Sequence, residues 1–371
     1  MDPFAHTFAG AALAATGLRR ATPLATAALL IGANAPDVDA VLMFSGDYLS
    51  VAHRRGWTHG ILAVLVLPLL ITAALLQWDR HFRRRWQPDR VPVRPWVLLG
   101  LAILAVASHP LLDWLNNYGM RFLMPFDGRW FYGDALFIID PVVWLVLGGV
   151  AFLTWSRRPA ALAAWGLFWS AASWLMMTDE RVPDTARLWW IFALAGLLAV
   201  RWLAGTGRLP RWPGETVAAL ALALTGVYML ANLAANIPAR AEVRAALTAQ
   251  GLGPVTQVMV SPVPANPWRG LVVAATPGGY YTGHWHWHWL GRPRFVAAPR
   301  AIPANMDDPL VIAAARSLHA RRFLTWARFP VARVLETGTG YRIEFGDARY
   351  DRGPGLGPVV HLDRNGTLLA R

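Results

Sequence analysis

The strongest constraint on the fold is a succession of apolar segments, most of them long enough to cross a lipid bilayer. A spanning helix needs about 20 predominantly apolar residues. Six long stretches of this chain fit that requirement: residues 57–77, 95–115, 137–156, 160–178, 187–204 and 215–236. Two shorter stretches rich in alanine and glycine, residues 5–18 and 22–36, precede them and could form short spanning helices or a re-entrant hairpin. The sequence therefore predicts a mainly α-helical, polytopic membrane domain over residues 1–238.

The composition agrees with a membrane protein that also carries a soluble part. Of the 371 residues, 55% are hydrophobic, only 15% are charged and 20 are tryptophan, which is not the profile of a soluble enzyme. The chain contains no cysteine, so disulfide bonds and thiolate metal ligands are excluded. The N-terminal residues have neither a basic segment nor a small-residue cleavage site, and we expect them to be retained.

The net charge of +13 indicates membrane topology rather than nucleic-acid binding, because the arginines cluster in short loops between apolar segments. The loop at 78–95 is the most basic, and basic loops face the cytoplasm. Alternating the spans from this loop places the other arginine pairs on the same side: Arg19 and Arg20, Arg157 and Arg158, and Arg208 and Arg211. We therefore expect a multi-pass protein of the bacterial inner membrane. Its expected partners are membrane lipids and not nucleic acid, and the sequence leaves the oligomeric state open.

Residues 239–371 contain no stretch of membrane length and predict a small soluble α+β domain. The alternation of spans places this domain on the extracytoplasmic side. A helix is expected across Pro309–Trp326. Strands are expected at Val255–Val260, Leu271–Ala275, Tyr280–Leu290, Arg333–Glu336, Tyr341–Phe345 and Val359–Leu362.

One of these strands alternates histidine with tryptophan over residues 284–289. On a strand, His284, His286 and His288 face one way and three tryptophans face the other. We favour an edge strand with a buried tryptophan face and a solvated histidine face. The alternatives are a second metal site or a surface that contacts lipid or glycan.

The stretch SHPLLDW places a histidine and an aspartate on one helix face, where a membrane-length apolar segment ends. His109 and Asp113 are four residues apart, and ionisable groups at membrane depth are costly and usually functional. In the topology above, the candidate ligands from the earlier segments fall on the same, extracytoplasmic face. This convergence predicts one metal site with the ligands His6, Asp37, His59, His109 and Asp113.

The ligand types point to zinc first, with manganese or iron as alternatives, and we expect one or two ions. Asp39 and His53 are candidates for a general base, for additional ligands or for groups that orient a ligand. Arg54 or Arg55 would hold an anionic substrate such as a phosphate ester.

Each of these features taken alone has a simpler structural explanation. The HxxxD pair could be a polar contact between helices, and the DxD at 37–39 could be a turn. His6 could be an interfacial residue, and His53 with the arginines after it could contact lipid headgroups. Asp140 before Pro141 is expected to cap the next helix, whereas Asp134 is either a loop residue or an extra ligand or base. The metal hypothesis rests on the convergence of the whole set.

The motifs also resemble those of a known family. His6, NAPDVD at 34–39, HRRGWTHG at 53–60, SHPLLDWLNNYG at 108–119 and GDALFIIDP at 133–141 occur in order. Over about residues 1–145 they resemble the LexA-binding, inner-membrane-associated metal-dependent hydrolase family, whose activity is itself a prediction. The order of ligands is also similar to the first half of zinc-dependent phospholipase C and the related single-strand nucleases. This chain lacks their second HxxxE or HxxxD, which implies one or two metals rather than three.

Two functional hypotheses follow from the sequence. The first is an integral-membrane metal-dependent hydrolase that acts on a phosphoester or lipid-linked small-molecule substrate at the extracytoplasmic face. The second is a non-catalytic, metal-stabilised membrane scaffold whose C-terminal domain binds a partner. A coordination position open to water would distinguish them, because structural zinc sites are closed.

Overall fold

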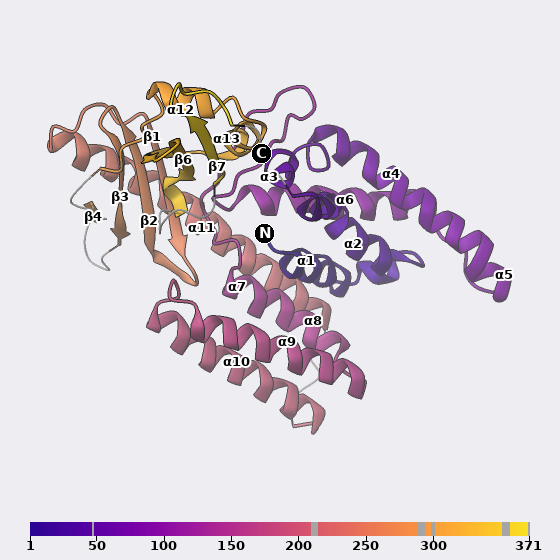
Figure 1. Cartoon of the computed structure of the whole chain (residues 1–371). Coiled ribbons are helices and arrows are strands. Elements are labelled where there is room, and N and C mark those ends of the chain that lie inside the picture. The colour runs from indigo at the N-terminus through magenta and orange to yellow at the C-terminus, as the bar shows by residue number, and fades with distance from the viewer. Residues whose placement is uncertain (47, 209–213, 288–293, 298–300, 351–356, 370–371) are drawn as a thin grey trace. The chain divides into compact units, whose positions relative to one another are not determined.

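The computed structural model describes residues 1–46, 48–208, 214–287, 294–297, 301–350 and 357–369. The chain divides into two compact units (Figure 1). The first unit contains residues 1–38, 55–235 and 261–267, and the second contains residues 39–54, 236–260 and 268–371.

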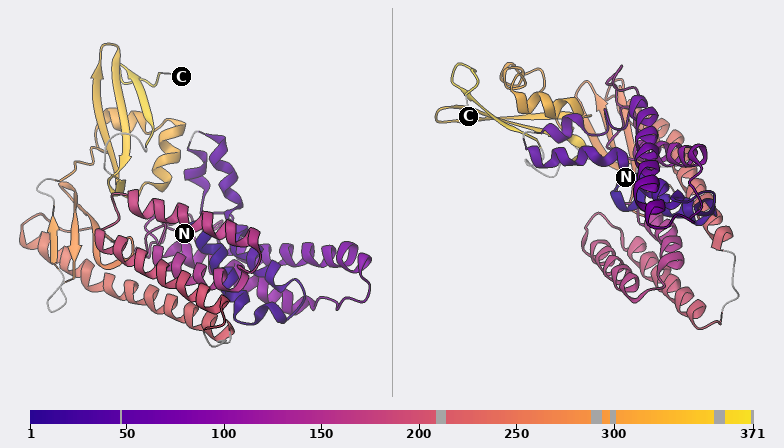
Figure 2. Two further views of the ribbon diagram at one scale, coloured as in Figure 1. Left: turned by 90° about the horizontal axis from the view of Figure 1, so that it is seen from below. Right: turned by 90° about the vertical axis from the view of Figure 1, so that its right-hand side faces the viewer.

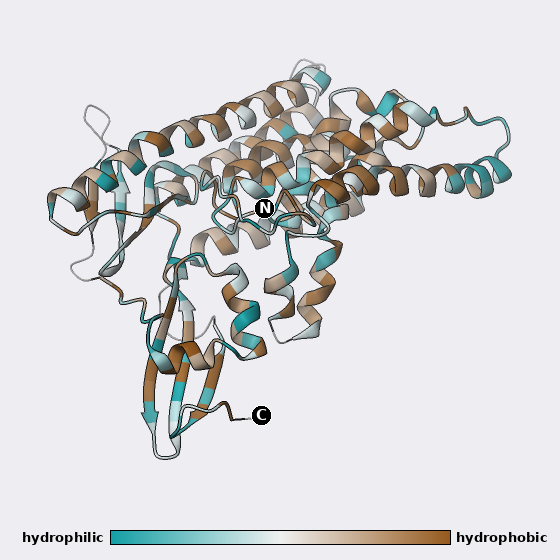
Figure 3. Cartoon of the chain, turned by 90° about the horizontal axis from the view of Figure 1, so that it is seen from above, coloured by the Kyte–Doolittle hydropathy of each residue, from teal (hydrophilic) through white to brown (hydrophobic). Residues whose placement is uncertain are grey.

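The first unit is helical. Its helices are α1 (Pro3–Ala15), α2 (Ala25–Asn34), α4 (Ile61–Trp78), α5 (Arg84–Trp86), α6 (Pro95–Trp114), α7 (Pro141–Val143), α8 (Gly149–Trp155), α9 (Pro159–Thr178), α10 (Asp184–Gly205) and the start of α11 (Gly214–Ala249). Among the described residues, six helical segments are long and apolar enough to cross a membrane. Hydrophobic residues dominate these helices (Figure 3), and their order along the chain can be followed by colour in Figure 2. The predicted fold class, a polytopic helical membrane domain followed by a small α+β part, is confirmed.

The six long segments are not the six that the sequence predicted. The predicted span 137–156 is only the short apolar helix Pro141–Trp155, in which the π-helical turn η4 (Trp144–Gly148) separates α7 from α8. The predicted short segment 22–36 is longer than expected, since α2 continues as the 3-10 helix η2 (Ala35–Ser45) and gives an apolar helical run of 21 residues. Hydropathy counts apolar residues but does not reveal where a helix changes its hydrogen-bonding pattern.

Small residues let the helices that surround the N-terminus pack closely. A Cβ atom added at Gly10 of α1 would lie 2.7 Å from the carbonyl oxygen of Leu29 on α2. One added at Gly32 of α2 would lie 2.8 Å from the Cβ of Ala105 on α6. Close approach through glycine and alanine is a common way for membrane helices to associate. The three helices that carry most of the candidate ligands are therefore held backbone to backbone.

Helix α1 is the centre of this packing. It begins with Asp2 as N-cap, whose carboxylate accepts hydrogen bonds from the backbone N–H groups of Phe4 and Ala5, and with Pro3 in the first turn. Ala5, Ala12 and Ala14 are fully buried. Because the first helical turn is fixed by this cap, the side chain of His6 is directed into the protein rather than toward the lipid.

The second unit contains two antiparallel sheets and short helices. The first sheet has the order β1 (Gln257–Val263), β2 (Asn266–Thr276), β3 (Gly279–His286) and β4 (Arg294–Ala297). The second has the order β5 (Pro330–Thr337), β6 (Gly340–Asp347) and β7 (Val359–Asp363). Its helices are α3 (Leu49–His53), which packs on α13 (Leu318–Trp326), and α12 (Pro309–Ala314).

The predicted helix Pro309–Trp326 is wrong as a single element. It is interrupted after α12, and Ser317 caps the N-terminus of α13 by accepting a hydrogen bond from the backbone N–H of Ala320. Strand β4 was not predicted at all. In β3, Trp285 is buried and His284 is exposed, which agrees with a buried tryptophan face. The predicted edge position is wrong, because β3 pairs with β2 on one side and with β4 on the other. The rest of this alternation from His288 onward lies outside the described residues.

Candidate metal centre

Helix α6 brings the predicted histidine–aspartate pair into the protein interior. His109 and Asp113 lie one turn apart and are both fully buried, whereas Leu111 between them points outward and is 56% exposed. Asp113 is the penultimate residue of α6. The pair therefore occupies the end of a membrane-length apolar helix, on the face that turns away from lipid.

His59 comes from a tight turn immediately before α4. The backbone N–H groups of His59 and Gly60 donate to the carbonyl of Gly56 at 3.1 and 2.7 Å, and Ile61 donates to the carbonyl of Phe122 at 2.8 Å. A Cβ at Gly60 would lie 2.4 Å from the carbonyl oxygen of Met124, so this position requires glycine. The turn fixes His59, which is fully buried.

Four side chains converge on a common point: Asp37 from η2, His59, His109 and Asp113. Their ligand atoms all lie within 4.8 Å of one another. The Nε2 atoms of His59 and His109 are 3.1 Å apart. Asp37 Oδ1 is 3.8 Å from each of these nitrogens, and Asp113 Oδ2 is 3.4 Å from that of His59 and 3.6 Å from that of His109.

These distances match the edges of a coordination tetrahedron. An ion bound at about 2.0–2.2 Å has donor–donor edges of about 3.3–3.6 Å in tetrahedral geometry. Five of the six donor–donor distances run from 3.1 to 3.8 Å, and the sixth, between Asp37 and Asp113, lies within 4.8 Å. The set of two imidazoles and two carboxylates is typical of zinc, manganese and iron sites.

Hydrogen bonds to one ring nitrogen of each histidine leave the other nitrogen available to bind a metal. The Nδ1–H of His109 donates to the carbonyl oxygen of Ala33 at 2.6 Å, so in the neutral ring Nε2 carries the lone pair. Nδ1 of His59 is bonded to the hydroxyl of Thr58 at 2.8 Å, which leaves its Nε2 to face His109. When both Nε2 atoms carry a lone pair, they repel at this distance unless a proton or a cation lies between them. A metal ion fits this arrangement.

His6 lies beside this group rather than inside it. Its ring is fully buried and stacks on His109, with ring centres 3.6 Å apart and planes inclined by 14°. Its Nε2 is 3.3 Å from Oδ1 of Asp113. Four of the five predicted ligands therefore share one centre, and the fifth contacts that centre through Asp113.

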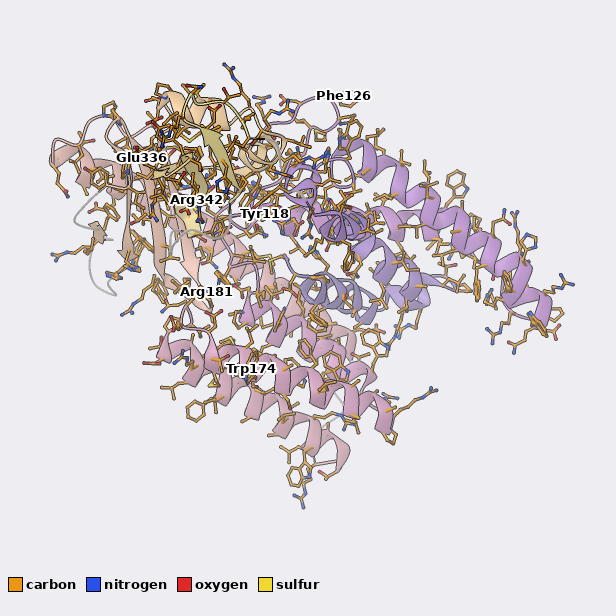
Figure 4. The ribbon with its side chains drawn as sticks, viewed as in Figure 1. Tyr118, Phe126, Trp174, Arg181, Glu336 and Arg342 are labelled. Carbon is orange, nitrogen blue, oxygen red and sulfur yellow. The ribbon has the colours of Figure 1, made fainter. Side chains whose placement is uncertain are left out.

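Arg55 contacts the ligand group directly, which the sequence did not reveal. Its Nε lies 2.9 Å from Oδ2 of Asp113, its guanidinium donates to Oδ1 of Asn116 at 2.8 Å, and it stacks on Tyr118 at 4.6 Å (labelled in Figure 4). Arg55 is buried and has a positive φ of 54°. It is thus a positioning residue for Asp113. Asn116 was not predicted as a functional residue either, although the sequence places an asparagine three residues after the aspartate of the HxxxD pair.

The three predicted catalytic residues belong to the second unit. Asp39 is buried and lies 3.6 Å from Nε of Arg54, and His53 ends α3 with an exposed side chain. None of the three is part of the four-residue group found among the described residues. Their catalytic roles stay predictions.

The two remaining carboxylates have different surroundings. Asp140 caps α7 by accepting hydrogen bonds from the backbone N–H groups of Val142 and Val143, as predicted, and Tyr228 donates to its Oδ2 at 3.0 Å. Asp134 is fully buried with a positive φ of 53° and lies outside the ligand group.

Comparison with known proteins agrees with the membrane assignment. Residues 1–182 match a family described as YdjM inner membrane protein, a range that contains all five predicted ligands. The chain is also similar to the uncharacterized protein YfhP of Bacillus subtilis, with 31% identity over 118 residues. That alignment covers 32% of this chain and 33% of the relative, so it spans about a third of each. No solved structure matches this chain. Together with the six apolar helices, the family match supports a multi-pass inner-membrane protein.

Proposed function

We propose that this chain is an integral-membrane metal-dependent hydrolase that acts on a phosphoester or lipid-linked substrate. The observation that carries the proposal is the convergence of two imidazole nitrogens and two carboxylate oxygens at tetrahedral spacing. The ligand atoms come from three separate segments of the chain, and each histidine has a hydrogen bond to its second nitrogen. Such outer hydrogen bonds fix the ring orientation of metal-binding histidines.

The site's chemistry follows from its own residues. A divalent ion held by Asp37, His59, His109 and Asp113 would lower the pKa of a bound water and polarise the scissile group. Arg55 holds Asp113 in place through Oδ2. Asp39 and His53 stay the sequence-based candidates for a general base, and Arg54 for binding an anionic group.

The position of the site in the chain favours a substrate at the membrane surface. His59 lies two residues before the start of α4, and Asp113 one residue before the end of α6, and both helices are membrane-length apolar segments. The site therefore lies where two spans end. The arginine distribution orients that end toward the extracytoplasmic side, and we propose the same orientation for the C-terminal domain.

A metal-stabilised scaffold is the second candidate, and one observation favours it. Four protein donors at tetrahedral spacing can fill the coordination sphere of zinc, as in structural sites. A hydrolase requires a further position for water. The coordination number of the bound metal therefore decides between the two functions.

The test begins with elemental analysis of detergent-purified protein. We expect bound transition metal in the wild type and its loss in the double variant His109→Ala with Asp113→Ala. The control is His81→Ala with Asp89→Ala, which removes the same residue types at exposed positions of the first unit. A wild type that stays metal-free after incubation with zinc or manganese would refute the proposal.

X-ray absorption spectroscopy then separates the two functions. A coordination number above four, with an oxygen ligand that exchanges with solvent, supports the hydrolase. Hydrolysis of phospholipids or lipid pyrophosphates by the wild type and not by the double variant would identify the substrate class. A closed four-coordinate site without hydrolysis would favour the scaffold.

A further inference from the structure

We propose that Asp113 bridges two cation positions and that His6 is a ligand of the second. This inference rests on the metal centre of the proposed function and specifies how many ions it holds. The first position is the tetrahedral group around Oδ2 of Asp113. The second lies on the side of Oδ1.

The two carboxylate oxygens of Asp113 face different partners. Oδ2 is 3.4 and 3.6 Å from the Nε2 atoms of His59 and His109, and 2.9 Å from Nε of Arg55. Oδ1 is 3.3 Å from Nε2 of His6. A spacing of 3.3 Å is again that of two atoms bound to one ion. A carboxylate whose oxygens face separate ligand sets is suited to bridge two ions.

The stacking of His6 on His109 shows why one ion cannot serve both rings. A ligating imidazole holds its metal close to the plane of the ring. The two ring planes are inclined by only 14° and the ring centres are 3.6 Å apart. An ion in the plane of His109 therefore lies well outside the plane of His6. Two ions, one in each plane, would be separated by about the ring spacing, and two-metal hydrolytic sites have separations of about 3.5–4 Å.

The surroundings of His6 agree with a cation at this point. The ring is fully buried, and its Nδ1 makes no hydrogen bond to the described residues. The ammonium group of Met1 also contacts Oδ1 of Asp113, so an ion bound at this oxygen takes the place of that ammonium. With only two protein ligands, the second ion leaves more positions for water or for substrate oxygens than the first, four-donor position does. The second ion therefore adds to the open coordination that hydrolysis requires.

The experiment compares metal stoichiometry in the wild type, His6→Phe, His6→Gln and the control His81→Gln. Phenylalanine keeps an aromatic ring stacked on His109 but removes both nitrogens, so it tests coordination without removing the packing. After saturation with manganese and removal of free ions, we expect about two ions per chain in the wild type and the control. We expect about half that content in both His6 variants. Electron paramagnetic resonance should show a spin-coupled manganese pair that becomes an isolated ion in the variants.

Each outcome has a definite meaning. If His6 only donates a hydrogen bond to Asp113, the stoichiometry will be the same in the wild type and in His6→Phe, and the inference is overturned. A wild type with one ion and hydrolytic activity overturns the second position while the proposed function stands. Two coupled ions without hydrolysis of any tested phosphoester support the second position and overturn the proposed activity. Solubility and melting temperature of each variant confirm that it is folded.

Discussion

Replacing Gly32 with alanine should weaken metal binding through helix packing alone. Gly32 on α2 touches no candidate ligand, but a Cβ atom there would lie 2.8 Å from the Cβ of Ala105 on α6. Carbon atoms pack at about 3.5–4.0 Å, so α2 and α6 must separate by roughly 0.7–1.2 Å. Asp37 follows α2 and His109 belongs to α6, and their ligand atoms are already 3.8 Å apart.

The size of the effect follows from the tolerance of metal coordination. Ligand distances in metal sites agree with their preferred values to within about 0.2 Å, so a shift of this size removes Asp37 from the coordination sphere. We expect metal affinity to fall tenfold or more, which corresponds to at least about 1.4 kcal/mol. Overpacking should also lower the free energy of unfolding by about 1–3 kcal/mol.

The assay is a competition titration of the purified protein against a chromophoric chelator. Gly100→Ala is the matched control, because a Cβ at Gly100 of α6 meets no atom within 4 Å. The double variant Gly32→Ala with Ala105→Gly removes the clashing methyl group and should recover most of the affinity. Unchanged affinity in a folded Gly32→Ala variant, or no recovery in the double variant, would refute the link between helix spacing and the ligand set.

Three further predictions concern single interactions. Arg55→Gln breaks the buried ion pair with Asp113 and should lower the free energy of unfolding by about 3–5 kcal/mol. The control Arg54→Gln, whose side chain is less buried, should lower it far less. Equal effects of the two substitutions would contradict the role of Arg55. Asp140→Ala removes the N-cap of α7 and should lower the free energy of unfolding, measured in thermal melts, by about 0.5–2 kcal/mol. The control Asp127→Ala, in an exposed loop, should not have this effect. Metal content should fall as the pH is lowered far enough to protonate the ligands, because imidazole and carboxylate bind metal only when deprotonated; a content that stays constant until the protein unfolds in acid would argue against coordination by these residues.

Local sequence patterns predicted most of the elements in the first unit. The predicted spans 95–115 and 160–178 correspond to α6 and α9 to within one residue at each end. Proline at the start of both helices, Pro95 and Pro159, marks these boundaries in the sequence. The π-helical turn between α7 and α8 had no such signal. It lies where Gly148 approaches the ring of Phe8, a contact between residues far apart in the chain.

The sequence by itself determined which residues are available for a metal site, since membrane helices rarely contain histidine or aspartate without a reason. It placed His109 and Asp113 on one helix face because their spacing is a property of the helix. Only the tertiary structure decided which of the predicted ligands share one centre and which one lies beside it. That His6 stacks on His109, and that Arg55 rather than Arg54 holds Asp113, depends on the packing of α1, α6 and the turn before α4. Such packing is set by contacts between residues far apart in the sequence, 103 positions for His6 and His109 and 58 for Arg55 and Asp113, which periodicity and spacing do not encode.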